Sequence, residues 1–412
     1  MMVQNNEKNP VLVVGGGVAG IIAAFDLAEM GRTVHLVDSA PLLGGQVAKL
    51  DKIYPTDHCA FCPLWTDIKK VQEHHRVIVH TTSKVTDITQ DADGYNVVIV
   101  CDPPAIDESL CIFCGRCVDT CTKGAVRPLW AHAYPPAYFI DRQLCAECGD
   151  CVDVCPTEAI NLNRTEVELF LAVDEVIWAT GFKEADLSTL PEFGMGTHPD
   201  VMTSLEFEEW IAEAGVNKGT ITRKVNGAVP KNIAFIQCVG ARDQRMLPYC
   251  SAVCCMHALK QAQWVKRRNP LIDCTILYTD LRTVGRGYNE YSLRELHESA
   301  ITFIRGRPGL IHPLPTGDAI AIKYENTLTQ TREIAKFDMV VLNGNLQTSP
   351  ARKAADSQHI PPLNGEGFVD TMQDEIPRYA CGFNLEPADI AESVIQASSA
   401  AMKVTIKEEL QK

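Results

Sequence analysis

Apolar and polar positions at the start of the chain follow the order of a strand, a tight turn, a helix and a second strand. Residues 10–14 (PVLVV) form a continuous apolar run, as expected of a strand buried in a parallel sheet. Residues 21–28 carry apolar side chains at helical spacing and end near Gly31, and residues 33–37 (TVHLV) form a second apolar run. This pattern predicts a βαβ unit.

The same patterning predicts two further regions. Strand-like runs at 232–237, 274–278 and 339–342 alternate with helical segments, which predicts a second α/β unit. A helical pattern covers residues 387–410, with Pro387 placed to occupy the first turn. A cysteine-rich and proline-rich stretch interrupts the first α/β region, which indicates an insertion that leaves and re-enters this region at surface loops. The predicted segments are 8–103, 104–163 (the insertion), 164–185, 186–345 and 346–412.

Composition narrows the class of protein. The chain has 412 residues, of which 46% are hydrophobic and 22% charged, so it has enough apolar side chains for two or three packed domains. Its net charge of -14 argues against a partner that is nucleic acid or an anionic membrane. No signal peptide is expected, and the longest weakly polar stretch, 11–25, is too short to span a membrane. We therefore expect a cytoplasmic protein without a transmembrane segment.

The turn of the first βαβ unit carries the chemistry of a dinucleotide site. Its sequence, GGGVAG, fits G-x-G-x-x-G with Gly15, Gly17 and Gly20, and encloses Val18 and Ala19. Asp38 follows the second strand, 18 residues after Gly20 in the chain. The glycines allow the backbone to approach a pyrophosphate at a helix N-terminus, and the acid can bind ribose hydroxyls. In this setting the motif predicts a dinucleotide cofactor.

The 17 cysteines stand mainly in short, regular groups. Two runs have the spacing C-x2-C-x2-C-x3-C of bacterial two-cluster ferredoxins, in which the fourth cysteine of each run binds the other cluster. We therefore expect two [4Fe–4S] clusters rather than zinc. One would be held by Cys111, Cys114, Cys117 and Cys155, and the other by Cys145, Cys148, Cys151 and Cys121.

A third group has a spacing that matches no zinc signature and consists of Cys238, Cys250, Cys254 and Cys255. Cys238 follows the predicted strand 232–237, where a pyridine-nucleotide flavoprotein has its second glycine-rich turn. No G-x-G-x-x-G occurs there or further along the chain. We expect a third [4Fe–4S] cluster in place of a nicotinamide site; the alternative is that these are buried structural thiols.

Two resemblances specify the cofactor and the family. The segments LGGQ (with Gly44, Gly45 and Gln46) and DEVIWATGF (with Thr180 and Gly181) resemble FAD motifs of the glutathione reductase and thioredoxin reductase class, which implies FAD. The segments LDKIYPTDHCAFC, QCVGARD, YCSAVCCM, RGRP and PADIAESVIQAS resemble the A-type subunit of heterodisulfide reductase, from about residue 11 to 404.

The family resemblance implies an α/β fold with a thioredoxin-reductase-like FAD-binding Rossmann core, an inserted 2[4Fe–4S] ferredoxin domain and a second α/β domain. It places Gly382, Asp389 and Ile390 at the FAD. The implied function is that of an oxidoreductase, an FAD and iron–sulfur electron-transfer subunit in which flavin-based electron bifurcation is possible. The implied partners are B- and C-type subunits and a hydrogenase-, formate- or NADH-linked donor or a ferredoxin, in a dimer of multi-subunit complexes.

Three points stay open in the sequence. Larger family members carry additional N- and C-terminal cluster domains, so one electron conduit is expected either to be missing or to belong to another subunit, which argues against bifurcation. Cys59 and Cys62 are candidates for a redox pair near the flavin, for cluster ligands, or for structural thiols. The alternative functions are an NAD(P)H-dependent flavoprotein disulfide reductase using these two thiols, or a subunit of a quinone-interacting oxidoreductase complex.

Overall fold

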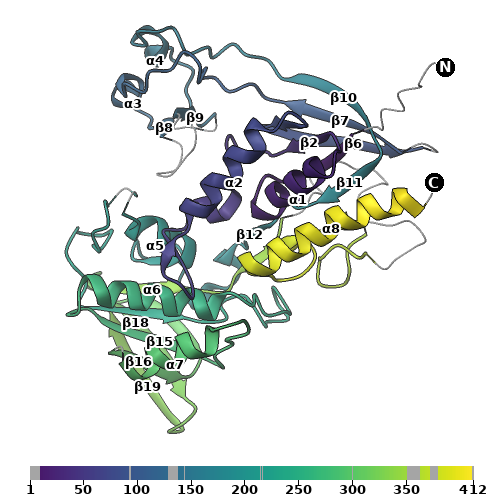
Figure 1. The fold of residues 1–412 in the computed structure, drawn as a ribbon. Helices are drawn as coiled ribbons and strands as arrows, with labels where there is room; N and C mark the ends of the chain where they lie inside the picture. Colours follow the sequence, from purple (N-terminus) through teal and green to yellow (C-terminus); the bar gives the residue numbers. More distant parts are fainter. Residues whose placement is uncertain are drawn as a thin grey trace, which may run out of the picture.

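The computed structural model is shown in Figure 1. It describes residues 10–91, 94–128, 138–142, 144–213, 215, 217–298, 300–349, 362–371 and 379–410. Within them the chain forms two α/β units and a smaller inserted part (Figure 1).

The first unit is built on a five-stranded parallel sheet of order β22-β11-β1-β2-β5. Its strands are β1 (Val11–Val14), β2 (Val34–Val37), β5 (Val77–His80), β11 (Glu175–Trp178) and β22 (Tyr379–Ala380). Apolar side chains of the sheet pack under α1 (Val18–Glu29), α2 (Phe61–Glu73) and α8 (Ile390–Leu410). The other face packs against an antiparallel sheet of β6 (Ser83–Gln90), β7 (Tyr95–Cys101) and β10 (Val167–Val173).

The cysteine-rich insertion leaves the first unit after β7 and returns at β10, two strands that pair with each other. An isolated bridge between Ile106 and Ile160 closes its base. It contains α3 (Arg116–Thr120), β8 (Val126–Pro128), β9 (Tyr138–Ile140) and α4 (Asp150–Asp153), around a small core of its own. In Figure 1 it lies at the upper left, where β7 ends and β10 begins.

The second unit has a parallel sheet of order β13-β20-β14-β15-β16. Its strands are β13 (Val201–Thr203), β14 (Asn232–Ile236), β15 (Asp273–Tyr278), β16 (Ile301–Arg305) and β20 (Met339–Leu342). One face packs under α5 (Ser204–Ile211), α6 (Cys254–Arg268) and α7 (Tyr288–Glu298). The other packs against an antiparallel sheet of β17 (Pro308–Pro313), β18 (Ile320–Asn326) and β19 (Thr331–Phe337).

Short elements join the units. The strands β12 (Phe182–Glu184) and β21 (Leu346–Thr348) pair antiparallel where the chain passes from one unit to the other and back. A hairpin of β3 (Lys52–Ile53) and β4 (His58–Cys59) extends from the first unit to the second. The 3-10 helices η1 (Gly45–Lys49), η2 (Leu187–Thr189), η3 (Pro191–Phe193) and η5 (Gly382–Asn384) complete the described elements.

The start of the C-terminal helix differs from the sequence prediction. Pro387 is not in the first turn, because α8 begins at Ile390. A capping box sets this boundary: the Asp389 carboxylate accepts the Glu392 N–H at 2.8 Å, and the Glu392 carboxylate accepts the Asp389 N–H at 3.0 Å. The predicted strand runs of the second unit match β14, β15 and β20, whereas the layer of β17, β18 and β19 is an addition that the sequence analysis did not identify. Among the described residues, no helix combines the length and apolar character needed to cross a membrane.

Two histidines in the first sheet lead to a pH prediction. His35 on β2 stacks on His80 of β5 with ring centroids 5.2 Å apart, and His35 Nδ1 lies 2.9 Å from His80 Nε2. Burial and then the neighbouring His80 lower the pKa of His35 to about 4, and burial lowers the pKa of His80. The unfolded chain therefore takes up protons below about pH 6.5 that the native state refuses, so stability contributed by the neutral pair is lost as pH falls from about 6.5 to 4.

We predict that His35→Gln flattens the decline of the free energy of unfolding between pH 6.5 and 4. One bound proton contributes a slope of up to about 1.4 kcal/mol per pH unit. Chemical denaturation across this range measures the slope. The exposed His75 provides a matched control, since His75→Gln should leave the slope as in the original protein. An unchanged slope in His35→Gln would contradict the assignment.

Candidate functional site: a dinucleotide turn and three cysteine groups

The glycine turn after β1 is packed so tightly that two of its positions exclude side chains. Gly15 has φ +113°, and a Cβ there would lie 2.2 Å from the Ala179 carbonyl oxygen. A Cβ on Gly20 would lie 1.7 Å from the Gly15 carbonyl oxygen. At Gly17, in contrast, the nearest atom to such a Cβ is 3.9 Å away, and α1 begins there without a side-chain cap. The turn thus leaves open space at the N-terminus of α1, as binding of a pyrophosphate requires.

Asp38 stands beside this turn at the carboxyl end of β2. Its carboxylate accepts the backbone N–H of Gly16 and, at 2.7 Å, that of Ala40. Burial raises the pKa of Asp38, while the two amides oppose the shift. The side chain therefore lies where the acid of a dinucleotide fold meets the ribose.

The other predicted FAD residues of the first unit gather around the same turn. The Gly44 N–H donates to the Gly16 carbonyl at 2.7 Å, and Gly44 forms an isolated bridge with Gly17. Gly44 and Gly45 have positive φ, and the Gln46 amide lies 3.4 Å from the Phe182 carbonyl oxygen.

Thr180 and Gly181 follow β11, the strand next to β1. The Thr180 hydroxyl lies 2.9 Å from the Ser349 carbonyl oxygen and 2.5 Å from Asn384 Oδ1. Gly382 approaches the start of α1, since a Cβ there would lie 3.0 Å from the Ala19 Cβ.

The C-terminal helix brings its N-terminus to the junction of the two units. It packs along α1, where the Ser398 hydroxyl donates to Asp26 at 2.6 Å. Asp389, which precedes Ile390, accepts a hydrogen bond from the hydroxyl of Tyr288 on α7. Asp389 is therefore held both by its own helix and by the second unit.

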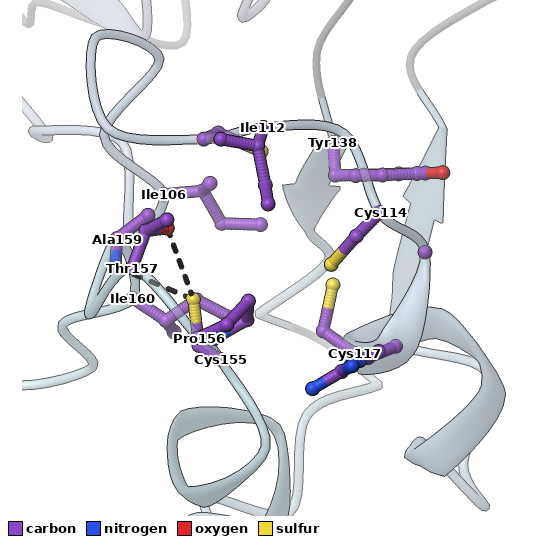
Figure 2. A pocket seen from close by; sticks show the side chains of 13 residues that line it. Ile106, Ile112, Cys114, Cys117, Tyr138, Cys155, Pro156, Thr157, Ala159 and Ile160 are labelled. Carbon is purple, nitrogen blue, oxygen red and sulfur yellow. Dashed lines mark hydrogen bonds between the residues drawn. The ribbon is translucent and has the colours of Figure 1, made fainter.

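Each predicted set of ferredoxin ligands lines one pocket in the inserted part. Cys111, Cys114, Cys117 and Cys155 line a pocket of about 320 Å³ together with apolar side chains such as Ile106 and Ile160. Figure 2 shows Cys114 and Cys117 on one side of this space and Cys155 on the other. A second pocket of about 370 Å³ is lined by Cys121, Cys145, Cys148 and Cys151. The structure thus brings the fourth cysteine of each run to the first three of the other run.

The two crossing cysteines share an environment that favours the thiolate. The backbone N–H groups of Ala125 and Ala159 lie 3.3 Å from the sulfurs of Cys121 and Cys155. Hydrogen bonding from backbone amides, led by Val126, lowers the pKa of Cys121. Burial acts to raise the pKa of Cys155, but the amides following it outweigh burial and lower it. Since the thiolate is the ligand form of cysteine, both positions suit iron.

The arrangement of ligands around a [4Fe–4S] cluster differs from that around a single metal ion. Across the described part of the chain, no three or more His, Cys, Asp or Glu side chains are arranged to hold one metal ion. The four thiolates around a [4Fe–4S] cluster bind different irons, and so surround a volume as the two pockets do.

The third cysteine group lies at the carboxyl end of the second sheet. Cys238 follows β14 with φ +58°, and Cys254 and Cys255 form the first turn of α6. A hydrogen bond with Cys255, then burial and the charges of neighbouring thiols, raise the pKa of Cys254; those neighbours include Cys238 and Cys250. The fold therefore places the other three thiols near enough to Cys254 to affect its pKa.

Cys59 and Cys62 stand apart as a second type of site. Cys59 ends β4 and Cys62 lies in the first turn of α2. The two thiols are close enough to hydrogen bond, which raises the pKa of the exposed Cys62, and both thiols are free. The pair is therefore placed as a dithiol would be, and it is not part of the three groups described above.

Known proteins are similar to this chain both at the dinucleotide turn and at the ferredoxin cysteines. A model of the family "FAD dependent oxidoreductase" matches residues 10–57, and one of the "4Fe-4S dicluster domain" matches residues 110–159. The A-type iron–sulfur subunit of the CoB–CoM heterodisulfide reductase of Methanocaldococcus jannaschii is 35% identical over 96% of the chain. An A-type subunit from Methanopyrus kandleri is 36% identical over 95%. The chain is therefore similar in sequence to these A-type subunits over almost its whole length.

The chain spans less than two thirds of the length of these relatives: 64% of the first and 63% of the second. Solved structures show the fold of its core. Thioredoxin reductases of T. acidophilum and Lactococcus lactis superpose with TM-scores of 0.53 and 0.55, at 14% and 16% identity, over 98% and 97% of this chain and 99% and 98% of theirs. The chain therefore has a thioredoxin-reductase-like fold with an FAD-binding domain and a two-cluster ferredoxin domain.

A buried polar cluster at the junction of the units was not predicted from the sequence. Lys260 Nζ on α6 donates to Glu208 Oε1 at 2.6 Å and to the Lys52 carbonyl at 2.9 Å. His257 Nε2 lies 3.3 Å from Glu208 Oε2. Burial opposes ionisation of Glu208, but Lys260 and His257 outweigh it and lower its pKa. The signal in the sequence is a run of three polar residues at helical spacing, His257, Lys260 and Gln261, all of which are buried and face Glu208.

Because there is open space at Gly17, a substitution at this position tests cofactor binding with little effect on folding. We predict that Gly17→Ala weakens FAD binding at least tenfold but lowers the thermal midpoint of the FAD-free protein far less than Gly20→Ala does, because the new Cβ meets no protein atom closer than 3.9 Å and only the N-cap preference is lost. Titration of the FAD-free protein with FAD measures the affinity. Gly20→Ala is the contrasting variant and should lower the midpoint too, since its Cβ overlaps Gly15. Full FAD affinity in Gly17→Ala would show that the cofactor does not approach this turn.

The crossed cysteine arrangement can be tested with paired substitutions. Cys111→Ala with Cys155→Ala removes two ligands of one predicted cluster and should lower iron content by about four. Cys111→Ala with Cys121→Ala removes one ligand from each cluster and should lower it by about eight. Iron analysis of anaerobically purified protein makes the comparison at an equal number of substitutions. The reverse ranking would mean that each run binds its own cluster.

Proposed function

We propose that this chain is an FAD and iron–sulfur electron-transfer subunit of a heterodisulfide-reductase-like complex. The observation that carries the proposal is the turn after β14. At the position where pyridine-nucleotide flavoproteins have their second glycine turn, this chain has Cys238, with Cys250, Cys254 and Cys255 beside it. A nicotinamide site is thus replaced by four thiols suited to a third [4Fe–4S] cluster.

The redox chemistry of flavin and iron–sulfur clusters explains how they would act together in this chain. Flavin exchanges one or two electrons, whereas an iron–sulfur cluster exchanges one. The chain's own part is placement: the glycine turn and Asp38 hold the dinucleotide, and three groups of thiols hold clusters. We propose that the residues predicted from the sequence hold these groups, and that the chain is divided into the five segments predicted from the sequence.

The relatives supply candidates for partners. The names of the A-type proteins from Methanothermobacter marburgensis and Methanosarcina acetivorans include CoB–CoM heterodisulfide and ferredoxin, with H2 in the first and F420H2 in the second. We propose that B- and C-type subunits and a low-potential one-electron donor join this chain in the cytoplasm, where reduced thiols persist. We propose further that the flavin bifurcates electrons, which would require electron conduits in addition to the FAD and the three cysteine groups.

The test is reduction of the flavin through the clusters. Anaerobically purified protein should contain about twelve irons per FAD, from three cubanes of four. Reduced ferredoxin should bleach the flavin at least ten times faster in this protein than in a variant with Cys114→Ala, Cys117→Ala, Cys148→Ala and Cys151→Ala, which removes two ligands from each ferredoxin cluster. Stopped-flow absorbance measures both rates, and NADH alone should bleach neither protein.

Other outcomes would contradict separate parts of the proposal. About eight irons per FAD would exclude the third cluster. Equal bleaching rates would exclude the ferredoxin clusters from the path of electrons. Rapid bleaching by NADH would favour an NAD(P)H-dependent disulfide reductase, for which Cys59 and Cys62 would be the thiols.

A further inference from the structure

Two buried amides lie side by side at the carboxyl end of the second sheet. Gln237 follows β14 and Asn343 follows β20, and the two strands pair in the register Ile236 with Leu342. The backbone pairing continues past the strand ends, because the N–H of Asn343 donates to the Ile236 carbonyl and that of Val239 to the Asn343 carbonyl, each at 2.8 Å. Gln237 is 2% exposed and Asn343 is fully buried.

These amides have polar atoms without partners. Among the described residues, neither Nε2 nor Oε1 of Gln237 has a hydrogen-bond partner, and neither does Oδ1 of Asn343. Asn343 Nδ2 makes a long bond of 3.3 Å to the Val341 carbonyl. Buried polar groups are almost always paired, so this pair indicates a partner other than the protein atoms described.

The pair lies on the face of the sheet that α6 covers. Phe235 and Val341, two residues before Gln237 and Asn343, pack in the core under α6 with Met256 and Leu259. Alternation along a strand places Gln237 and Asn343 on the same face, at the edge where α6 begins. This edge is the carboxyl end of parallel strands at the point where the strand order reverses, the usual ligand site of such sheets.

The segment that carries the remaining cysteines rests on the same strand ends. The Ser251 hydroxyl donates to the Gly344 carbonyl, next to Asn343. Gly344 in turn packs against Cys238, since a Cβ there would lie 3.1 Å from the Cys238 Cα. The first turn of α6, with Cys254 and Cys255, has no side-chain cap. The unpartnered amides and the four thiols thus share one corner of the second unit.

We propose that Gln237 donates a side-chain N–H hydrogen bond to a sulfur of the iron–sulfur cluster held by Cys238, Cys250, Cys254 and Cys255, with Asn343 positioning the amide. This rests on the proposed third cluster. The Gln237 amide has two N–H groups. Asn343 Oδ1, which also lacks a partner among the described residues, follows the neighbouring strand and would accept one of them once the other is bound to sulfur. A hydrogen bond to sulfur stabilises the extra negative charge of the reduced cluster, and so raises its reduction potential.

The test is a redox titration of the whole protein followed by electron paramagnetic resonance. Gln237→Met keeps the length of the side chain and removes the donor. We expect at least a tenfold change in the ratio of oxidised to reduced third cluster at a fixed potential, equivalent to about 59 mV toward lower potential for a one-electron couple. Asn343→Leu should shift the potential in the same direction. The two ferredoxin clusters are internal controls, and Thr275→Val on β15 removes a buried hydroxyl from the same sheet and should not shift any potential.

A second measurement covers loss of the cluster in these variants. The original protein labelled with ¹⁵N in its glutamine side chains should show a ¹⁵N hyperfine coupling to the reduced third cluster in pulsed spectra. Absence of this coupling, or an unchanged potential in Gln237→Met with the cluster present, overturns the role of Gln237 and leaves the proposed function intact. About eight irons per FAD in the original protein overturns the third cluster and this inference with it.

Discussion

The carboxyl edges of two parallel sheets fix where the chemistry of this chain lies. In a parallel sheet every strand ends at the same edge, so residues that follow different strands meet there. In the first unit β1 is followed by Gly15 and in the second β14 is followed closely by Cys238, both with positive φ. The same position in two similar units thus carries a glycine turn open to a pyrophosphate in one case and a thiol in the other.

The inserted part follows a different constraint, the crossing of its two cysteine runs. Cys155 lies with the first run and Cys121 with the second, so neither run forms a complete site by itself. A part this small has only a modest apolar core, here centred on residues such as Ile106, Val126 and Ile160. Clusters that bind both runs would link them and add stability to the fold, as metal binding does in other small domains.

Features that depend on residues close together in the chain could be predicted from the sequence, whereas contacts between distant residues could not. The βαβ unit, the ferredoxin spacing and the strands β14, β15 and β20 were predictable because each depends on residues close together in the chain. The start of α8 at Ile390 was missed because Pro387 and the capping box of Asp389 and Glu392 are competing local signals, and the two reciprocal hydrogen bonds prevail. The site contacts of Thr180 with Ser349 and Asn384 join residues 169 and 204 positions apart, which no local pattern reports.

Contacts of this long-range kind also hold the two units in register. The carbonyl of Lys52 in the β3–β4 hairpin of the first unit accepts from Lys260 on α6 of the second, and Glu208 keeps that lysine paired. Tyr288 on α7 donates to Asp389, the cap of α8, and its ring meets Tyr54 of the same hairpin edge-on with centroids 5.3 Å apart. Tyr54 is also close enough to Cys254 for the charge of that thiol to raise the pKa of the phenol, after burial and the charges of Tyr288 and Asp389. One buried set of contacts therefore connects the third cysteine group to the N-terminus of α8. Because electron transfer depends on fixed separation between redox groups, buried contacts at this junction are where the fold would set that separation.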